Sequence, residues 1–200
     1  MSENPFDLTG KVAIVTGTSR GLGQYFGRAL ARAGADLVIT SRDPAMLAPF
    51  QAEIEALGRR ALPLPLEVRS LDSIRTMVEA AVAHYGKIDV LVNNAGCNVR
   101  KLALDITWDD WNLVLETNLR GTFFVSQAVA RHMIARKYGR IINLGSVTCV
   151  FGYAGLGLTL SSPAATRRRW HRSKPRSRLW AAGRCRWRST CAVPRASRPW

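Results

Sequence analysis

The sequence predicts an α/β protein built on a doubly wound parallel sheet, and three observations support this fold class. Over the first 150 residues, short runs of β-branched and apolar residues alternate with longer segments of helical periodicity. The runs are continuously apolar, as in Val12-Ala13-Ile14-Val15, which is typical of strands covered by helices on both faces. A glycine-rich segment directly follows the first run and opens the first helical segment.

The expected strands and helices alternate along the chain. Each strand is a short apolar run, and each helix carries apolar residues three and four positions apart. The expected strands are Val12 to Val15, Leu37 to Thr40, Ala61 to Leu66, Val90 to Val92 and Arg140 to Leu144. The expected helices are Leu22 to Ala33, Ala45 to Leu57, Leu71 to His84 and Trp108 to Arg136. This order is the signature of a parallel sheet with crossover helices.

The basic charge of the chain is concentrated in its C-terminal segment. Residues 1–162 hold 17 Lys and Arg against 14 Asp and Glu, whereas residues 163–200 hold 12 Lys and Arg and no acid, giving the net charge of +15. That segment contains four of the six Trp and shows no apolar periodicity. Its Arg, Ala, Pro, Trp and Cys content is what GC-rich DNA gives when translated out of frame. We expect a folded domain over residues 1–157 and an out-of-frame basic tail over residues 158–200.

The composition excludes several other classes of protein. At 47% hydrophobic residues, the chain is neither disordered nor fibrous. Its four cysteines form no CxxC pair and no His/Cys cluster at metal-ligand spacing, so neither a zinc site nor a disulfide framework is expected. The N-terminus carries no signal-peptide pattern, and no apolar run reaches about 18 residues. We therefore expect a cytoplasmic protein with no metal and no membrane association.

The segment Thr16-Gly17-Thr18-Ser19-Arg20-Gly21-Leu22-Gly23 lies where the first strand passes into the first helix. Glycines at such a turn let the backbone bend tightly and approach a pyrophosphate closely. The N-terminus of the following helix presents unpaired N–H groups and a partial positive charge to the same anion. A glycine-rich turn can also be merely structural, but its place between strand and helix favours dinucleotide binding.

Four motifs in order make the chain resemble the short-chain dehydrogenase/reductase family. They are Thr16 to Gly23, Asn93-Asn94-Ala95-Gly96 after the fourth strand, Asn118 within a long helix, and Ser146 after Ile141-Ile142-Asn143-Leu144-Gly145. The similarity covers about residues 8–157. It implies a Rossmann-type fold, here incomplete at its C-terminal strands, because one or two further parallel strands usually follow.

The resemblance implies a cofactor site made by the glycine turn and the segments after the later strands. The turn would hold the dinucleotide phosphates, and the Asn-Ala-Gly segment would line the adenosine and stabilise the central strand. Glu67-Val68 occupies the place where the family usually has Asp-Val beside the adenine. The residues concerned are Gly17, Ser19, Arg20, Gly21, Leu22, Gly23, Arg42, Glu67, Val68, Asn94, Ala95 and Gly96. For the Asn-Ala-Gly segment alone, a plain β-turn is the competing interpretation.

The charges near the second strand favour NADP(H) over NAD(H). An acidic residue at the end of that strand would accept hydrogen bonds from the ribose hydroxyls and select NAD, but the sequence has Thr40-Ser41-Arg42 there. Arg42 and Arg20 instead supply two cations that can grip a 2′-phosphate. The alternative interpretation is that both arginines are solvated surface residues.

The implied reaction is hydride transfer between the nicotinamide and the carbon of a carbonyl or alcohol substrate. By resemblance, Ser146 would hydrogen-bond the substrate oxygen and Asn118 would help hold a proton-relaying water. The family also uses Tyr-x-x-x-Lys, in which the Lys lowers the pKa of the Tyr. No Tyr follows Tyr153 among the 200 residues, and the only later Lys is Lys174, so we expect little or no turnover.

Partners and substrates are less closely determined. The pattern is similar to 3-oxoacyl carrier-protein reductases and sugar or sugar-acid dehydrogenases, which are usually homo-oligomers; the missing helix would carry much of that interface. A non-catalytic nucleotide-binding protein is the main alternative. Binding of nucleic acid through the 11 Arg and interleaved Trp of residues 163–200 is a further one, although a segment of this charge binds DNA without sequence preference.

Overall fold

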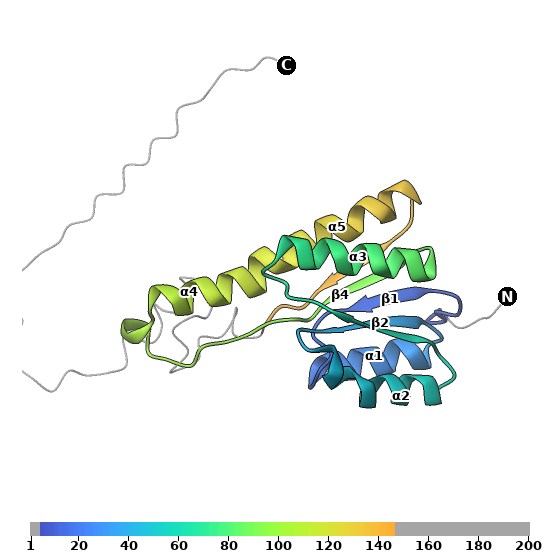
Figure 1. The fold of residues 1–200 in the computed structure, drawn as a ribbon, viewed down its shortest axis with the longest axis horizontal. Coiled ribbons are helices and arrows are strands. Elements are labelled where there is room, and N and C mark those ends of the chain that lie inside the picture. Colours follow the sequence, from blue (N-terminus) through green and yellow to red (C-terminus); the bar gives the residue numbers. More distant parts are fainter. Residues whose placement is uncertain (1–4, 147–200) are drawn as a thin grey trace, which may run out of the picture.

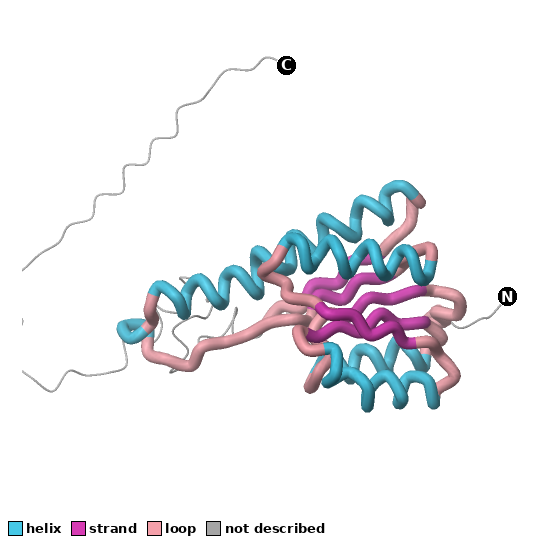
Figure 2. The backbone as a smooth tube through the Cα atoms, in the orientation of Figure 1, coloured by secondary structure: helices cyan, strands magenta, loops and turns pink. Residues whose placement is uncertain are grey.

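The apolar runs form neighbouring strands of one parallel sheet. The computed structural model describes residues 5–146, in which five strands lie in the order β3-β2-β1-β4-β5 (Figures 1 and 2). The strands are β1 (Val12–Val15), β2 (Asp36–Ser41), β3 (Ala61–Pro65), β4 (Val90–Asn93) and β5 (Arg140–Asn143). All four pairings are parallel. The expected fold class is confirmed, and each strand lies within one residue of its expected bounds.

Helices cover both faces of the sheet. In Figure 1, α1 and α2 lie on one face and α3 and α5 on the other, while α4 projects beyond the sheet. The helices are α1 (Leu22–Arg32), α2 (Ala48–Ala56), α3 (Leu71–Tyr85), α4 (Trp108–Leu115) and α5 (Thr122–Ala135). Three short helical segments accompany them, η1 (Pro44–Leu47), η2 (Ala103–Asp105) and the π-helical η3 (Glu116–Gly121).

Alternate residues of each central strand enter two separate cores. Ile14 points to the cluster that contains buried residues of α3 and α5, whereas its neighbour Val15 belongs to the cluster that contains Phe50 and Ile54 of α2. Both strand residues are fully buried. This two-sided burial explains why the strand sequences are continuously apolar rather than alternating.

Two buried carboxylates stabilise the edge of the sheet where the parallel strands begin. Asp89, just before β4, accepts a hydrogen bond from the backbone N–H of Val12 at 3.0 Å and pairs with Lys87 and Arg136, each at 3.2 Å. Asp36, the first residue of β2, pairs with Arg59 and Arg60 on the β3 side. These networks lie at the opposite end of the strands from the glycine turn.

Two expected helices differ from the structure. Ala45 to Leu57 is divided into η1 and α2, and Trp108 to Arg136 is interrupted by the π-helical η3. At the end of the described sheet, all four residues of β5 are exposed. Residues 147–157, including Tyr153, and the expected tail over residues 158–200, including Lys174, lie outside the described residues.

Within residues 5–146, no helix is long and apolar enough to cross a membrane. In the same part of the chain, no three side chains of His, Cys, Asp or Glu gather where they could hold a metal ion.

Candidate cofactor site

The glycine turn between β1 and α1 adopts a backbone that only glycine accepts without strain. Gly17 has a φ of 70° and Gly21 a φ of 65°, both in the left-handed region. A Cβ on Gly17 would also lie 2.9 Å from the Cα of Ala95, so the turn rests directly on the segment after β4. The two glycine motifs are therefore parts of one surface.

Gly23 serves a different purpose from the other two glycines. It is buried and does not line the cavity described below. A Cβ there would clash with the carbonyl oxygen of Gly17 and lie 2.7 Å from the side-chain nitrogen of Asn94. The residue is glycine because the first turn of α1 packs against the back of the phosphate-binding turn expected from the sequence.

Hydrogen bonds lock the glycine turn to the segment after β4. The hydroxyl oxygen of Thr16 accepts from the backbone N–H groups of Asn94 and Ala95, both at 2.9 Å. The side-chain amide of Asn94 donates to the carbonyl oxygens of Thr16 at 2.9 Å and Gly17 at 3.0 Å. Asn94 and Ala95 were expected from the sequence, but the role of the Thr16 hydroxyl was not, because its only signal is a polar residue directly after a buried strand.

Thr40, at the end of β2, supports the turn from its other side. The backbone N–H of Thr18 donates to the carbonyl oxygen of Thr40 at 2.8 Å, and its hydroxyl donates to the same oxygen at 3.2 Å. The backbone N–H of Gly17 donates to the Thr40 hydroxyl at 3.3 Å. The turn is thus fixed by β2 and β4, the two strands that flank β1 in the sheet.

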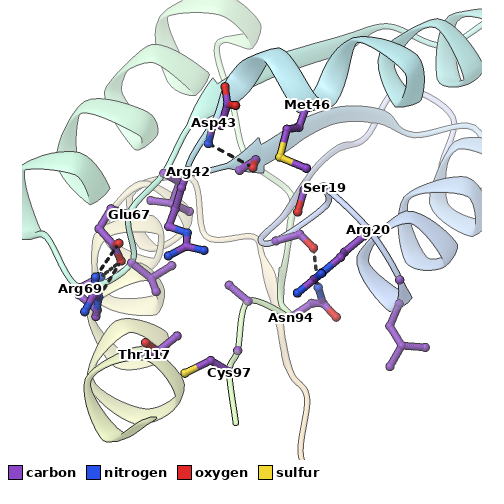
Figure 3. A pocket seen from close by; sticks show the side chains of 18 of the residues that line it. Ser19, Arg20, Arg42, Asp43, Met46, Glu67, Arg69, Asn94, Cys97 and Thr117 are labelled. Carbon is purple, nitrogen blue, oxygen red and sulfur yellow. Dashed lines mark hydrogen bonds and ion pairs between the residues drawn. The ribbon is translucent and has the colours of Figure 1, made fainter. Parts of the chain in front are cut away.

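A cavity of about 870 Å³ opens at this end of the sheet (Figure 3). Of the 12 residues that the sequence assigns to the cofactor, 11 line it, Gly23 being the exception. The structure adds eight lining residues that were not assigned to the cofactor from the sequence, which are Ser41, Asp43, Met46, Leu66, Arg69, Cys97, Leu113 and Thr117. These come from the end of β2, from η1, from the turns after β2, β3 and β4, and from α4 and η3.

Three arginines border the cavity in two different electrostatic states. Within residues 5–146, the guanidinium groups of Arg20 and Arg42 form no hydrogen bond or ion pair. Arg69 is instead paired with Glu67 at 3.1 Å (Figure 3). Arg20 and Arg42 therefore retain their full hydrogen-bonding capacity for an anion, since a guanidinium offers five donors.

The N-terminus of α1 adds a further positive contribution. The helix begins after Gly21 with no side-chain cap and no acidic residue in its first turn. Such a terminus leaves backbone N–H groups and the positive end of the helix dipole for a ligand. Around one cavity, the glycine turn, the uncapped helix terminus and two guanidinium groups without a partner among the described residues fit a phosphorylated dinucleotide.

Asn118 braces the wall of the cavity from the π-helical segment η3. Its side-chain oxygen accepts from the backbone N–H of Cys97 at 2.8 Å, and its side-chain nitrogen donates to the carbonyl oxygen of Cys97 at 2.8 Å. A Cβ on Gly96 would lie 3.2 Å from the same Asn118 oxygen. Asn118 is exposed and is not itself among the lining residues.

Ser146 is the last described residue and follows β5. It is exposed and is not among the residues that line the cavity. The end of β5 is held by Asn143, whose side-chain oxygen accepts from the side-chain nitrogen of Asn93 at 2.8 Å. The same nitrogen of Asn93 donates to the Ser126 hydroxyl of α5 at 2.8 Å. The strand that precedes Ser146 is thus tied to the strand that precedes the Asn-Ala-Gly segment.

A family model described as "short chain dehydrogenase" matches residues 11–167. The chain belongs to the short-chain dehydrogenase family. Among curated relatives, it is 44% identical over 145 residues to 2-dehydro-3-deoxy-D-gluconate 5-dehydrogenase of Escherichia coli, covering 71% of this chain and 56% of the relative. It is 38% identical over 149 residues to the 3-oxoacyl-[acyl-carrier-protein] reductase FabG of Vibrio cholerae, covering 74% of this chain and 60% of the relative. This chain thus spans less than two thirds of the length of each of these two relatives.

Solved structures of dehydrogenases and oxidoreductases agree with the fold. An NAD⁺-bound xylitol dehydrogenase superposes with a TM-score of 0.74 at 32% identity, covering 82% of this chain and 62% of that one. A metagenomic short-chain oxidoreductase in complex with NADP superposes with a TM-score of 0.72 at 34% identity, covering 80% of this chain and 74% of that one. Both nicotinamide cofactors therefore occur among structures similar to this short-chain dehydrogenase.

Proposed function

We propose that residues 1–157 form an NADP(H)-binding oxidoreductase domain of cytoplasmic type, and that the 200-residue chain binds the cofactor with little or no turnover. The observation that carries the proposal is that the guanidinium groups of Arg20 and Arg42 border the cavity beside the glycine turn and have no partner in the described part of the chain. The 200-residue chain would then act as a nucleotide-binding protein without catalysis.

Each part of the cavity has a proposed role in holding the cofactor. The backbone from Gly17 to Leu22 would bind the pyrophosphate, because its glycines allow close approach and α1 begins there. Arg20 and Arg42 would bind the 2′-phosphate, since planar guanidinium groups grip phosphate oxygens bidentately. Asn94 to Gly96 would line the adenosine, and Glu67 with Val68 would border the base.

The bound cofactor supplies the hydride, and the chain supplies orientation and charge stabilisation. Ser146 would hydrogen-bond the substrate oxygen, where charge develops during the reaction. Asn118 would fix the Gly96–Cys97 wall through its two hydrogen bonds and help hold the proton-relaying water. Without Tyr-x-x-x-Lys, general acid catalysis worth about 100- to 10,000-fold is lost.

The proposed substrate class is a small carbonyl or alcohol compound of the 3-oxoacyl or sugar-acid type. The names of the relatives support both types, because one acts on a deoxygluconate and the other on a 3-oxoacyl carrier protein. We propose no specific nucleic acid partner. Family members are usually homo-oligomers, and we propose that this chain lacks much of that interface, because its sequence beyond residue 157 departs from the family pattern.

Titration of the full chain with NADPH and NADH tests the cofactor proposal. We expect NADPH to bind about tenfold or more tightly, since the two guanidinium groups contact only the 2′-phosphate. The variants Arg20→Ala and Arg42→Ala should lose this preference while NADH binding is kept. Arg75→Ala is the matched control, because Arg75 is 70% exposed on α3 and pairs with Asp72. Equal affinity for the two cofactors, or binding of neither, would overturn the proposal.

A further inference from the structure

The side chain of Asn93, the last residue of β4, contacts both β5 and α5. It is 5% exposed and lies on the same face of β4 as Leu91, which shares a core cluster with Val125 of α5. Its side-chain nitrogen donates to Asn143 Oδ1 of β5 and to Ser126 Oγ of α5, both at 2.8 Å. This amide bridge, formed by Asn93, Asn143 and Ser126, joins β4 to its neighbouring strand and to a helix that covers the sheet (Figure 1).

The amide bridge leaves one of its own atoms without a partner. Within residues 5–146, Asn93 Oδ1 is buried and accepts no hydrogen bond, which costs free energy. The two acceptors of the bridge do not depend on Asn93 for their own hydrogen bonding. The Ser126 hydroxyl donates to the carbonyl oxygen of Thr122 at 2.7 Å, and Asn143 is exposed to water. An apolar residue at position 93 would therefore cost the fold little, so stability alone does not account for the amide.

Asn93 and its neighbour Asn94 hold the two strands on opposite sides of β4. Asn94 is joined through Thr16 to the glycine turn after β1, whereas the side chain of Asn93 is joined to β5. The backbone follows the same division, because the carbonyl oxygen of Asn93 accepts from the N–H of Leu144 at 3.1 Å. Ser146 follows Leu144 by two residues. The Asn93-Asn94 pair thus joins one wall of the cavity to the strand that precedes Ser146.

We propose that Asn93 is a positioning residue for the substrate oxygen, whose amide holds the end of β5, and with it Ser146, at a fixed place relative to Asn94–Gly96. This inference rests on the proposed function, in which Asn94–Gly96 hold the cofactor and Ser146 hydrogen-bonds the substrate. Transfer of a hydride requires the reacting atoms to be held about 3–3.5 Å apart and aligned. The side-chain amide can meet this requirement because it donates two directed hydrogen bonds at once, which an apolar side chain cannot do.

Backbone hydrogen exchange and urea denaturation of the full chain test the inference. In Asn93→Leu, we expect exchange at the Leu144 amide to become about tenfold faster, as for the loss of one local hydrogen bond. Exchange at Leu91, inside β4, should be unchanged, and the urea midpoint should equal or exceed that of the parent chain. The affinity for NADPH should also be unchanged, since Asn94 keeps its hydrogen bonds to Thr16.

Position 143 provides a matched pair of variants. Asn143→Asp keeps an acceptor oxygen for the Asn93 amide, so exchange at Leu144 should be as slow as in the parent chain. Asn143→Leu removes that acceptor and should behave as Asn93→Leu does. Because residue 143 is exposed, neither substitution buries a charge or opens a cavity. The pair therefore isolates the hydrogen bond from the packing of the strand.

The NMR signal of the Ser146 side chain reports on the proposed role directly. It should shift when NADPH binds to the parent chain and to Asn143→Asp, and this response should be lost in Asn93→Leu. Parent-like exchange at Leu144 in Asn93→Leu, or a lower urea midpoint with faster exchange at Leu91 as well, would overturn the inference while cofactor binding stands. Retention of the Ser146 response in Asn93→Leu would do the same. Failure of the parent chain to bind NADPH would overturn the proposed function and this inference together.

Discussion

The hydroxyl oxygen of Thr16 and the side chain of Asn94 form a reciprocal clamp. Thr16 accepts the backbone N–H of Asn94 at 2.9 Å, and Asn94 donates its side-chain amide to the Thr16 carbonyl oxygen, also at 2.9 Å. The two residues are 78 positions apart, one after β1 and the other after β4. The clamp joins two separate turns into one surface of the candidate cofactor site.

Thr16→Val should weaken both folding and cofactor binding. The substitution keeps the shape but leaves the N–H groups of Asn94 and Ala95 without their acceptor, which costs about 2 kcal/mol of unfolding free energy. Urea denaturation measures the loss, and NADPH titration measures its effect on the site. Thr16→Ser keeps the acceptor and should recover most of both; if Ser is as damaging as Val, the hydroxyl is not responsible.

Gly23→Ala should disrupt the site although Gly23 lies outside the cavity. The added methyl group would clash with the Gly17 carbonyl oxygen and the Asn94 amide, so the glycine turn must move. We expect a loss of about 2 kcal/mol in stability and at least about tenfold weaker NADPH binding. Gly145→Ala is the control, because a Cβ there meets no atom of residues 5–146 within 4 Å. Equal behaviour of the two variants would refute the packing argument.

Asp89→Asn should destabilise the domain at a distance from the site. The Asp89 side chain is 1% exposed and contacts the backbone N–H of Val12, Lys87 and Arg136. Neutralising Asp89 therefore weakens three charge-assisted contacts. We expect the unfolding free energy to fall by about 2–3 kcal/mol. Asp72→Asn removes a carboxylate that is 93% exposed and should cost less than about 0.5 kcal/mol. Chemical denaturation of both variants shows whether the loss of stability comes from the burial of the carboxylate or from the loss of one negative charge.

Acid should reduce the stability of the domain through Asp36 and Asp89. Burial alone would raise the pKa of each carboxyl, but hydrogen bonds and the charges of the neighbouring basic side chains outweigh it and lower both pKa values. A lowered folded-state pKa gives stability that is present above the unfolded value of about 3.9 and is lost as the pH falls through the folded value.

The corresponding measurement is the unfolding free energy between pH 7 and pH 2. We expect the stabilisation by these two groups to change little between pH 7 and about pH 5 and to fall progressively below about pH 4. The Asp89→Asn variant should show a smaller fall than the parent chain, because one of the two linked groups has been removed. An identical pH dependence in the variant would contradict the assignment of Asp89.

If residues 158–200 are translated out of frame, the DNA that encodes them should contain the expected continuation in another reading frame. Reading codons 150–200 in all three frames should give, in one alternative frame, a Tyr-x-x-x-Lys helix and further parallel strands. A chain restored in this way should reduce carbonyl substrates with NADPH, whereas the present chain should not. If no frame gives such a continuation, the basic segment over residues 158–200 is a genuine part of the protein.

The strands were predictable from the sequence because their burial is encoded locally. A continuous apolar run such as Val12–Val15 needs no knowledge of its neighbours to be recognised as a strand covered on both faces. The division of the helix expected over Ala45 to Leu57 is also local in origin. Pro49 has no N–H to donate to the residue four positions earlier, so α2 begins at Ala48 with Pro49 in its first turn.

The sequence alone thus determined the fold class, the position of the glycine turn and the two arginines that are proposed to favour NADP(H). Only the tertiary structure decided that Gly23 packs behind the turn, that Asn118 braces Cys97, and that Arg69 pairs with Glu67 while Arg20 and Arg42 have no partner among residues 5–146. The physical reason is that a residue's type states what its side chain can bond to, whereas packing between distant segments selects the partner it does bond to.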